Sequence, residues 1–134
     1  MKKNISLFIA AFSVVMLFAF VPKKVYNDPW PVPDAFKNKA NPIKGNAESV
    51  ATGKALYSQH CKSCHGPKGK GDGPKASQLD TECGDFTKAT FQAQTDGAIF
   101  YKTSEGRKDM PSFKKKIAEP NDIWAVVNYM RTLK

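Results

Sequence analysis

Apolar residues recur at helical spacing in three stretches of the chain. The first runs over about 47–61 after a capping Asn46, and the second over about 95–104, with Gly106 as its terminator. The third runs over about 120–133. Its apolar side consists of Ile123, Val126, Val127, Met130 and Leu133. No stretch of any length alternates apolar and polar residues with the period of a strand. The pattern therefore predicts an all-α fold.

A separate apolar run occupies the N-terminus. Residues 1–4 form a positive leader, and the 17 residues from Ile5 to Val21 carry no charge. This pattern predicts an export signal or a membrane anchor rather than a buried core helix. Leu17 is too bulky for a small-x-small cleavage site ending at Ala19, so we favour an anchor that is not cleaved. Either alternative for residues 1–21 predicts that the rest of the chain is exported.

Residues 22–45 form an arm rich in proline and lysine. Five of the nine prolines lie in it, which favours a stiff, extended backbone. One interpretation is a spacer that holds residues 46–134 away from the membrane. The alternative is that the arm packs on those residues, with Trp30 and Phe36 as its contacts, because large aromatic side chains seldom stay idle in a free linker.

The net charge limits the kinds of partner that the chain can bind, and its length limits the size of its core. The formal net charge is +9, so the chain suits acidic proteins, anionic lipid or nucleic acid. Export argues against nucleic acid, and no arrangement of stacking aromatic and basic residues supports it. Residues 46–134 are few for a core made of protein alone. A large apolar prosthetic group would relieve that shortage.

One short stretch could attach such a group: Cys61-Lys62-Ser63-Cys64-His65. Two cysteines three positions apart, followed at once by a histidine, form the c-type haem attachment pattern. Each thiol can bind one vinyl group of a haem, and one helical turn brings both under the same edge of the ring, with His65 beneath the iron. A zinc site and a redox-active dithiol are the alternatives, because CxxC also serves both. Residues 66–74 hold four glycines and two prolines. They predict a tight loop at the haem edge rather than a phosphate cradle.

The second axial ligand of the iron can be argued by elimination. His60 precedes Cys61 on the same helix and cannot easily reach the opposite face of a haem. Met1 and Met16 belong to the leader, and Met130 lies on the apolar face of the last helix. Met110, in a loop and followed by proline, remains. Its thioether is a good ligand for haem iron, and an iron with both axial sites filled exchanges single electrons but does not readily activate oxygen or peroxide.

These pieces together resemble a class I c-type cytochrome over about residues 46–134. The matching motifs are Gly53-x-x-x-Tyr57, Cys61-Lys62-Ser63-Cys64-His65, Gly71-Asp72-Gly73-Pro74, Thr95-Asp96-Gly97, Met110-Pro111 and Trp124 to Tyr129. The resemblance implies a small cytochrome c fold with three main helices around one covalently attached haem. It also implies that Gly53 and Tyr57 meet Tyr129 where the first and last helices cross. The leader and arm are similar to those of membrane-tethered bacterial cytochromes.

A further implication of the resemblance concerns Pro74. In the family, a proline carbonyl accepts a hydrogen bond from the other nitrogen of the ligand histidine, which here is His65. Cys83 departs from the family pattern. It is either a small buried apolar residue or a thiol that pairs between molecules, and a zinc site of Cys61, Cys64, His65 and Cys83 is conceivable only in a chain that received no haem.

The predicted function is that of a monohaem electron carrier between respiratory redox partners, without a small-molecule substrate. Basic residues flank the predicted haem loops and would steer an acidic partner: Lys62, Lys68, Lys70, Lys75, Arg107, Lys108 and Lys114 to Lys116. A fixed haem subunit of a larger membrane oxidoreductase complex is the first alternative. A peroxidase-like haem enzyme, which would need Met110 to leave the iron, is the second.

Overall fold

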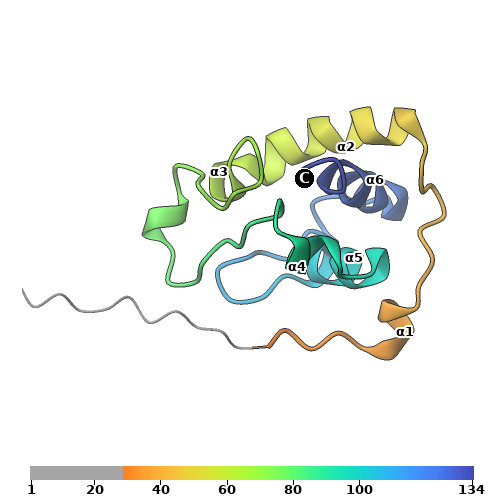
Figure 1. Cartoon of the computed structure of the whole chain (residues 1–134), viewed down its shortest axis with the longest axis horizontal. Helices are drawn as coiled ribbons and strands as arrows, with labels where there is room; N and C mark the ends of the chain where they lie inside the picture. Colours follow the sequence, from red (N-terminus) through yellow and green to blue (C-terminus); the bar gives the residue numbers. More distant parts are fainter. Residues whose placement is uncertain (1–28) are drawn as a thin grey trace, which may run out of the picture.

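A computed structural model describes residues 29–134 of the chain, and the leader predicted in residues 1–21 lies outside that part. Figure 1 shows the order of the elements. The helices are α1 (Asp34–Lys37), α2 (Ala47–His60), α3 (Lys62–His65), the 3-10 helix η1 (Ala76–Gln78), α4 (Ala89–Gln92), α5 (Asp96–Glu105) and α6 (Pro120–Met130). Residues 29–134 contain no strand, only an isolated bridge between Arg107 and Met110. The predicted all-α class is therefore confirmed.

The ends of the main helices follow from local chemistry. The side chain of Asn46 accepts a hydrogen bond from the backbone N–H of Ser49 at 3.0 Å, which satisfies one free donor at the start of α2. Thr95 caps α5 in the same way, with the N–H of Ala98 as donor. Gly106 ends α5 at φ +67°, a conformation that favours glycine. The last helix ends at Met130, three residues earlier than predicted.

Helices α2 and α6 cross in direct backbone contact at Gly53. A Cβ atom added there would overlap the carbonyl oxygen of Ala125. One turn further along α2, Tyr57 is 1% exposed and packs on Tyr129, with their ring centroids 5.1 Å apart. The family-implied crossing of the first and last helices is thus present, with Gly53 against the α6 backbone and Tyr57 against Tyr129.

The core lies mainly between these two helices and α5. Val126 and Val127 are fully buried, and Ile99, Ile123 and Met130 are nearly so. Each such side chain contributes roughly 1.5–3 kcal/mol by leaving water. The apolar face predicted for the last helix is therefore the face that packs against α2 and α5.

Within residues 29–45 the arm packs on the domain, so the spacer interpretation is wrong for this part of it. Figure 1 shows its first part, up to α1, on the side opposite α2 and next to α5, and the rest rising to the start of α2. The Phe36 and Tyr101 rings lie 4.9 Å apart, and Gly97 on α5 leaves room for the backbone of Phe36. Asn41 donates to the side chains of Asp96 and Asn128. Contacts between polar groups and between rings hold the arm along its length.

Between residues 29 and 134, no helix is long and apolar enough to cross a membrane.

Candidate cofactor site

The two motif cysteines lie on one turn that continues α2. The N–H of Cys61 still bonds to the carbonyl of Tyr57, and the N–H of His65 bonds to the carbonyl of Cys61, both at 2.9 Å. Cys61 is 8% exposed, Cys64 is half-buried, and Cys83 is partly exposed; none of the three forms a disulfide. A helical turn therefore presents both thiols and the imidazole together, as the motif predicted.

The glycine-rich loop wraps closely around this turn. The N–H of Gly73 bonds to the carbonyl of Cys64 at 3.1 Å, and a Cβ at Gly73 would collide with the backbone of the motif. The Tyr57 hydroxyl donates to the carbonyl of Gly66 at 2.7 Å, and the N–H of Gly71 bonds to the carbonyl of His65 at 2.9 Å. The loop thus fixes the motif rather than binding a phosphate.

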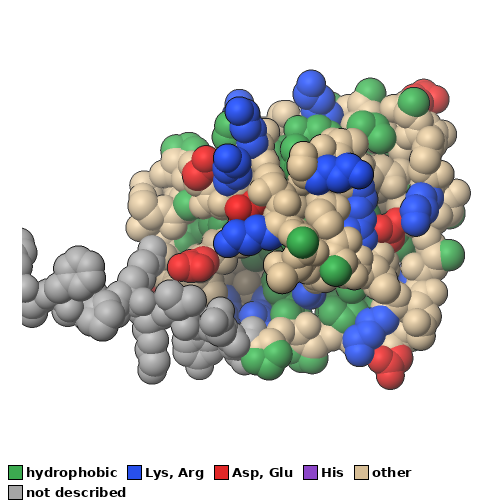
Figure 2. Space-filling model, in the orientation of Figure 1, with side chains coloured by type: hydrophobic (Ala, Val, Ile, Leu, Met, Phe, Trp, Pro, Cys, Tyr) green, Lys and Arg blue, Asp and Glu red, His purple; other side chains and the backbone are tan. Residues whose placement is uncertain are grey.

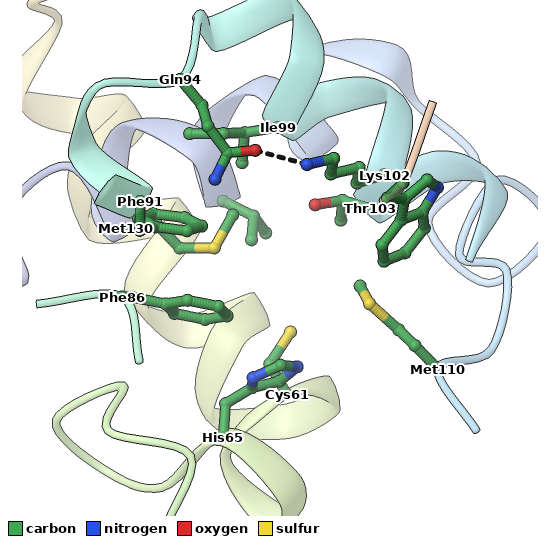
Figure 3. Close-up of a pocket in the computed structure, with 12 residues that line it drawn as sticks. Cys61, His65, Phe86, Phe91, Gln94, Ile99, Lys102, Thr103, Met110 and Met130 are labelled. Atoms are coloured by element: carbon green, nitrogen blue, oxygen red, sulfur yellow. Dashed lines mark hydrogen bonds between the residues drawn. The ribbon is translucent and has the colours of Figure 1, made fainter. Parts of the chain in front are cut away.

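The motif faces a cavity made of two adjoining hollows of about 180 and 640 Å³. Trp30, Cys61, His65 and Met110 line both hollows. The smaller hollow is mostly apolar. Its other walls are Phe86, Phe91, Gln94, Ile99, Lys102, Thr103, Val126 and Met130 (Figure 3). A large flat apolar cofactor with a polar rim suits such a space.

His65 has the properties of a metal ligand. Its ring stacks on Phe86 at 4.5 Å, and Phe86 stacks on Phe91 at the same distance. Burial lowers the pKa of His65 to about 4, partly opposed by a hydrogen bond with the backbone of Cys83, so the imidazole is neutral at pH 7. Its Nδ1 atom is buried and has no hydrogen-bond partner. A buried polar atom left in this state is costly unless a cofactor or a rearrangement completes the site.

The predicted bond from His65 to the carbonyl of Pro74 is not made in this structure, because Nδ1 of His65 lacks a partner. Pro74 is nevertheless anchored close to the motif. The residues on either side of it, Gly73 and Lys75, donate backbone hydrogen bonds to Cys64 and Ser63 at 3.1 and 2.9 Å. The role of Pro74 stays a prediction for the protein with its cofactor.

Met110 comes to the same cavity from the loop after α5. Its backbone pairs with that of Arg107 through two hydrogen bonds of 2.8 and 3.0 Å, which close a tight turn. Figure 3 shows the Met110 side chain reaching into the open space that His65 also lines, from a different segment of the chain. The structure therefore brings together the two residues that the sequence predicted as axial ligands.

The remaining candidates lie elsewhere or have a second role. His60 is half-buried at the edge of the larger hollow, with its ring 6.0 Å from Phe113. Met130 is 4% exposed in the core, as predicted, and also lines the smaller hollow. Among residues 29–134, no three His, Cys, Asp or Glu side chains are grouped to hold a metal ion.

Sequence reasoning missed several walls of the site. Phe86 and Phe91 lie in a segment without periodicity, so no pattern marked them as core residues. Lys102 lies on a predicted helix, but nothing in its spacing indicated that it would face a cavity. Trp30 was predicted only as a contact between the arm and the domain. Its large apolar side chain was the one signal that could have pointed to the cavity.

The decisive comparison is with protein families. The family model for cytochrome c matches residues 50–134, which is more than half of the chain. The chain belongs to the cytochrome c family. Its cofactor is accordingly haem c, attached covalently through the Cys61 and Cys64 thiols, with His65 following them. The residues found here fit that group: a thiol pair on one turn, a neutral imidazole beside it and an apolar cavity.

Solved structures agree with this family. The chain is similar to a protein described as the KustC0563 c-type cytochrome, at 34% identity and a TM-score of 0.54, over 61% of this cytochrome and 96% of that chain. A tyrosine-to-phenylalanine mutant of Kustc0563 matches at 32% identity and a TM-score of 0.53, over 62% and 99%. No protein with curated annotation matches.

A longer match is to a chain of the Kuenenia stuttgartiensis reducing HAO-like protein complex Kustc0457/Kustc0458, at 27% identity and a TM-score of 0.63. It covers 81% of this cytochrome, whereas the chain spans about half, 52%, of that protein. Since 81% of 134 residues is about 109, the match extends beyond the 89 residues of 46–134. Part of the similarity therefore lies outside the cytochrome domain itself.

Proposed function

We propose that this cytochrome is a monohaem electron carrier whose iron is ligated by His65 and Met110. The observation that carries the proposal is that these two side chains, from segments far apart in the chain, line the same cavity. Haem iron supplies reversible one-electron exchange, and His/Met ligation raises its potential. With both axial positions filled, no open site remains for oxygen or peroxide.

The chain's own residues support a carrier in two further ways. His65 lies on its motif turn and stacks on Phe86, which restrains the imidazole at the cavity. The walls of the smaller hollow are mostly apolar, which would keep water away from a bound haem, so that little solvent would have to reorient when an electron is gained or lost. Small rearrangement on gain or loss of an electron is what a carrier requires.

The test of the proposal is the visible spectrum of the haem-loaded protein and of its Met110→Ala variant. The wild type should show sharp reduced α and β bands and a weak far-red sulfur-to-iron band when oxidised. Met110→Ala should keep the haem attached, lose the far-red band and lower the midpoint potential. Met130→Leu is the matched control, because it removes the other thioether of the cavity and should leave the far-red band in place. An unchanged spectrum and potential in Met110→Ala would refute the ligand assignment.

The partner we propose is a protein with an acidic face. Lys75, Arg107 and Lys116 line the larger hollow, and Lys75 and Lys116 are exposed. Figure 2 shows more Lys and Arg than Asp and Glu side chains on the visible face. Lys114, another of the basic residues near the predicted haem loops, is paired with Glu105 at 2.7 Å, so it should contribute less to the attraction of an acidic partner. Electron transfer should slow as ionic strength rises. Rates that do not depend on salt would contradict this docking.

We further propose that the domain acts in the periplasm, tethered or exported by residues 1–21. The support is the charge pattern of that segment and the covalent haem, which is attached outside the cytoplasm in proteins of this kind. Fractionation of cells, with the mass of the mature haem protein, tests both points. Haem protein recovered only from the cytoplasm would contradict export, and a mass without residues 1–21 would establish cleavage.

A second candidate function is that of a fixed haem subunit. It is favoured by the match to a chain of a reducing HAO-like protein complex, which extends beyond the cytochrome domain. Purification in mild detergent distinguishes the two. A stoichiometric complex that persists at high salt would support the subunit role, and a cytochrome that elutes alone would support the mobile carrier.

A further inference from the structure

Trp30 belongs to the arm, yet its side chain lies at the cofactor cavity. It lines both hollows together with Cys61, His65 and Met110. Among the arm residues that the structure describes, 29–45, it is the only one that does so. Trp30 is also only partly exposed, so its ring closes part of the cavity against solvent.

Two cations hold the Trp30 ring in this place. The guanidinium carbon of Arg107 lies 4.8 Å from the ring centroid, and Nζ of Lys102 lies 5.7 Å from it. Both distances fit a cation–π contact. Burial and the neighbouring Arg107 lower the pKa of Lys102, whose ammonium is hydrogen-bonded to Gln94. The indole therefore packs between a helix of the domain and the loop that carries Met110.

The backbone beside Trp30 is fixed as well. Nη1 of Arg107 donates to the carbonyl oxygen of Pro29 at 2.9 Å, and Val32 is buried with 8% of its surface exposed. Trp30 is thus attached on both sides rather than carried on a loose end of the arm.

Arg107 connects the arm to Met110. Its side chain holds Pro29 and Trp30, while its backbone makes both hydrogen bonds of the turn that ends at Met110. A movement of the Met110 loop away from the cavity would have to break the contacts of Arg107 with the arm. The arm and the loop should therefore open together.

We propose that Trp30 is a haem-contact residue and Arg107 a positioning residue, and that together they close the Met110 side of the site. This inference rests on the proposed ligation by His65 and Met110. Its consequence is that the arm keeps small molecules from replacing Met110 on the iron. The arm is then part of the cofactor site as well as a connection to the leader.

The experiment measures how fast imidazole displaces Met110 in the oxidised, haem-loaded full-length protein. Imidazole at pH 8 is mostly neutral, so removal of a nearby positive charge does not itself change its approach. The variants are Trp30→Ala, Trp30→Phe and Arg107→Gln, and Pro31→Ala is the control, because Pro31 is an exposed neighbour in the same arm. The far-red band and the midpoint potential are recorded for each.

Trp30→Ala should bind imidazole about tenfold faster than the wild type, since the ring contributes both apolar burial and two cation contacts. Arg107→Gln should accelerate binding about two- to fivefold, which corresponds to the loss of one partly exposed cation–π contact. Trp30→Phe should restore most of the barrier, and Pro31→Ala should match the wild type. A Trp30→Ala protein that keeps the far-red band and binds imidazole at the wild-type rate would overturn the inference.

Failure of the underlying ligation has a different signature. A wild-type protein without the far-red band, whose spectrum Met110→Ala does not change, would refute the His65 and Met110 assignment and this inference with it. If Trp30→Ala does not accumulate as haem protein, the Arg107→Gln rate decides. Imidazole binding to Arg107→Gln at the wild-type rate would then overturn the inference.

Discussion

Replacement of Gly53 by alanine tests the contact between α2 and α6. The turn with Cys61, Cys64 and His65 continues α2, so its position depends on this contact. The new Cβ would overlap the carbonyl oxygen of Ala125 and lie 3.0 Å from the backbone nitrogen of Val126. Relaxed carbon contacts are about 3.5–4.0 Å. Even the more distant of these two atoms must therefore move by about 0.5 Å or more, and both belong to backbone that cannot rotate aside. The two helices have to separate.

The expected cost follows from two opposed terms. Overpacking in a close contact costs about 1–3 kcal/mol, and a clash with backbone belongs at the upper end. Alanine in place of glycine inside a helix gains about 1 kcal/mol. The net expectation is that Gly53→Ala lowers the free energy of unfolding by about 2 kcal/mol. That is a substantial part of the roughly 5–15 kcal/mol typical of a small domain.

The assay is guanidinium unfolding of the haem-loaded protein, followed by circular dichroism at the helix band. Ala51→Gly is the control, because Ala51 is exposed on the same helix and its replacement measures helix propensity alone, about 1 kcal/mol of destabilisation. A Gly53→Ala protein as stable as the wild type, or more stable, would show that the helices do not touch at this position, and the reasoning would fail.

The remaining predictions concern one ion pair and one carboxylate. Arg131→Ala should lower the free energy of unfolding by about 3 kcal/mol, because it leaves the part-buried Asp96, 2.7 Å away, without its charge partner. The same denaturation assay on Lys37→Ala, from an exposed pair, should show a change of less than about 1 kcal/mol, and equal losses would contradict this distinction. The hydroxyl and N–H of Thr87 bond to Asp85 and hold its pKa below the ordinary 3.8. This contact stabilises the fold above about pH 4 and is lost as pH falls through the lowered pKa. Thr87→Val should raise that pKa in an NMR titration, and an unchanged value would assign the shift to other groups.

The sequence predicted the parts of this cytochrome that depend on short-range chemistry. The helix starts at Asn46 and Thr95 follow from side chains that bond to their own helix, and the CxxCH turn follows from residues that are neighbours in the chain. The prediction of Met110 used elimination, which was possible because the chain holds few other donors, and the structure places Met110 at the cavity. These inferences need no knowledge of which distant segments meet.

The features that the sequence did not predict depend on contacts between segments that are distant in the chain. The spacing of Phe86 and Phe91 has no helical or strand period, since the segment that holds them takes a shape that follows the cavity rather than a repeat of its own. The arm shows the same limitation. Proline content describes how stiff a segment is, but the docking of residues 29–45 on α5 depends on Gly97 leaving room for Phe36 and on the polar bonds of Asn41.

The two sides of the site are held by forces of different kinds. His65 is on a turn that continues α2, and α2 is locked to α6 at Gly53 and through the buried Tyr57. Met110 is held by the backbone pair with Arg107, by the exposed hydrogen bond of Arg107 to the arm, and by Ser112 and the buried Phe113, which bond to the carbonyl of Ser104. Segments with few buried apolar contacts open at a lower free-energy cost than the core. Under the ligation that we propose, loss of Met110 from the iron would require that the loop and arm open, whereas displacement of His65 would require that the two main helices part.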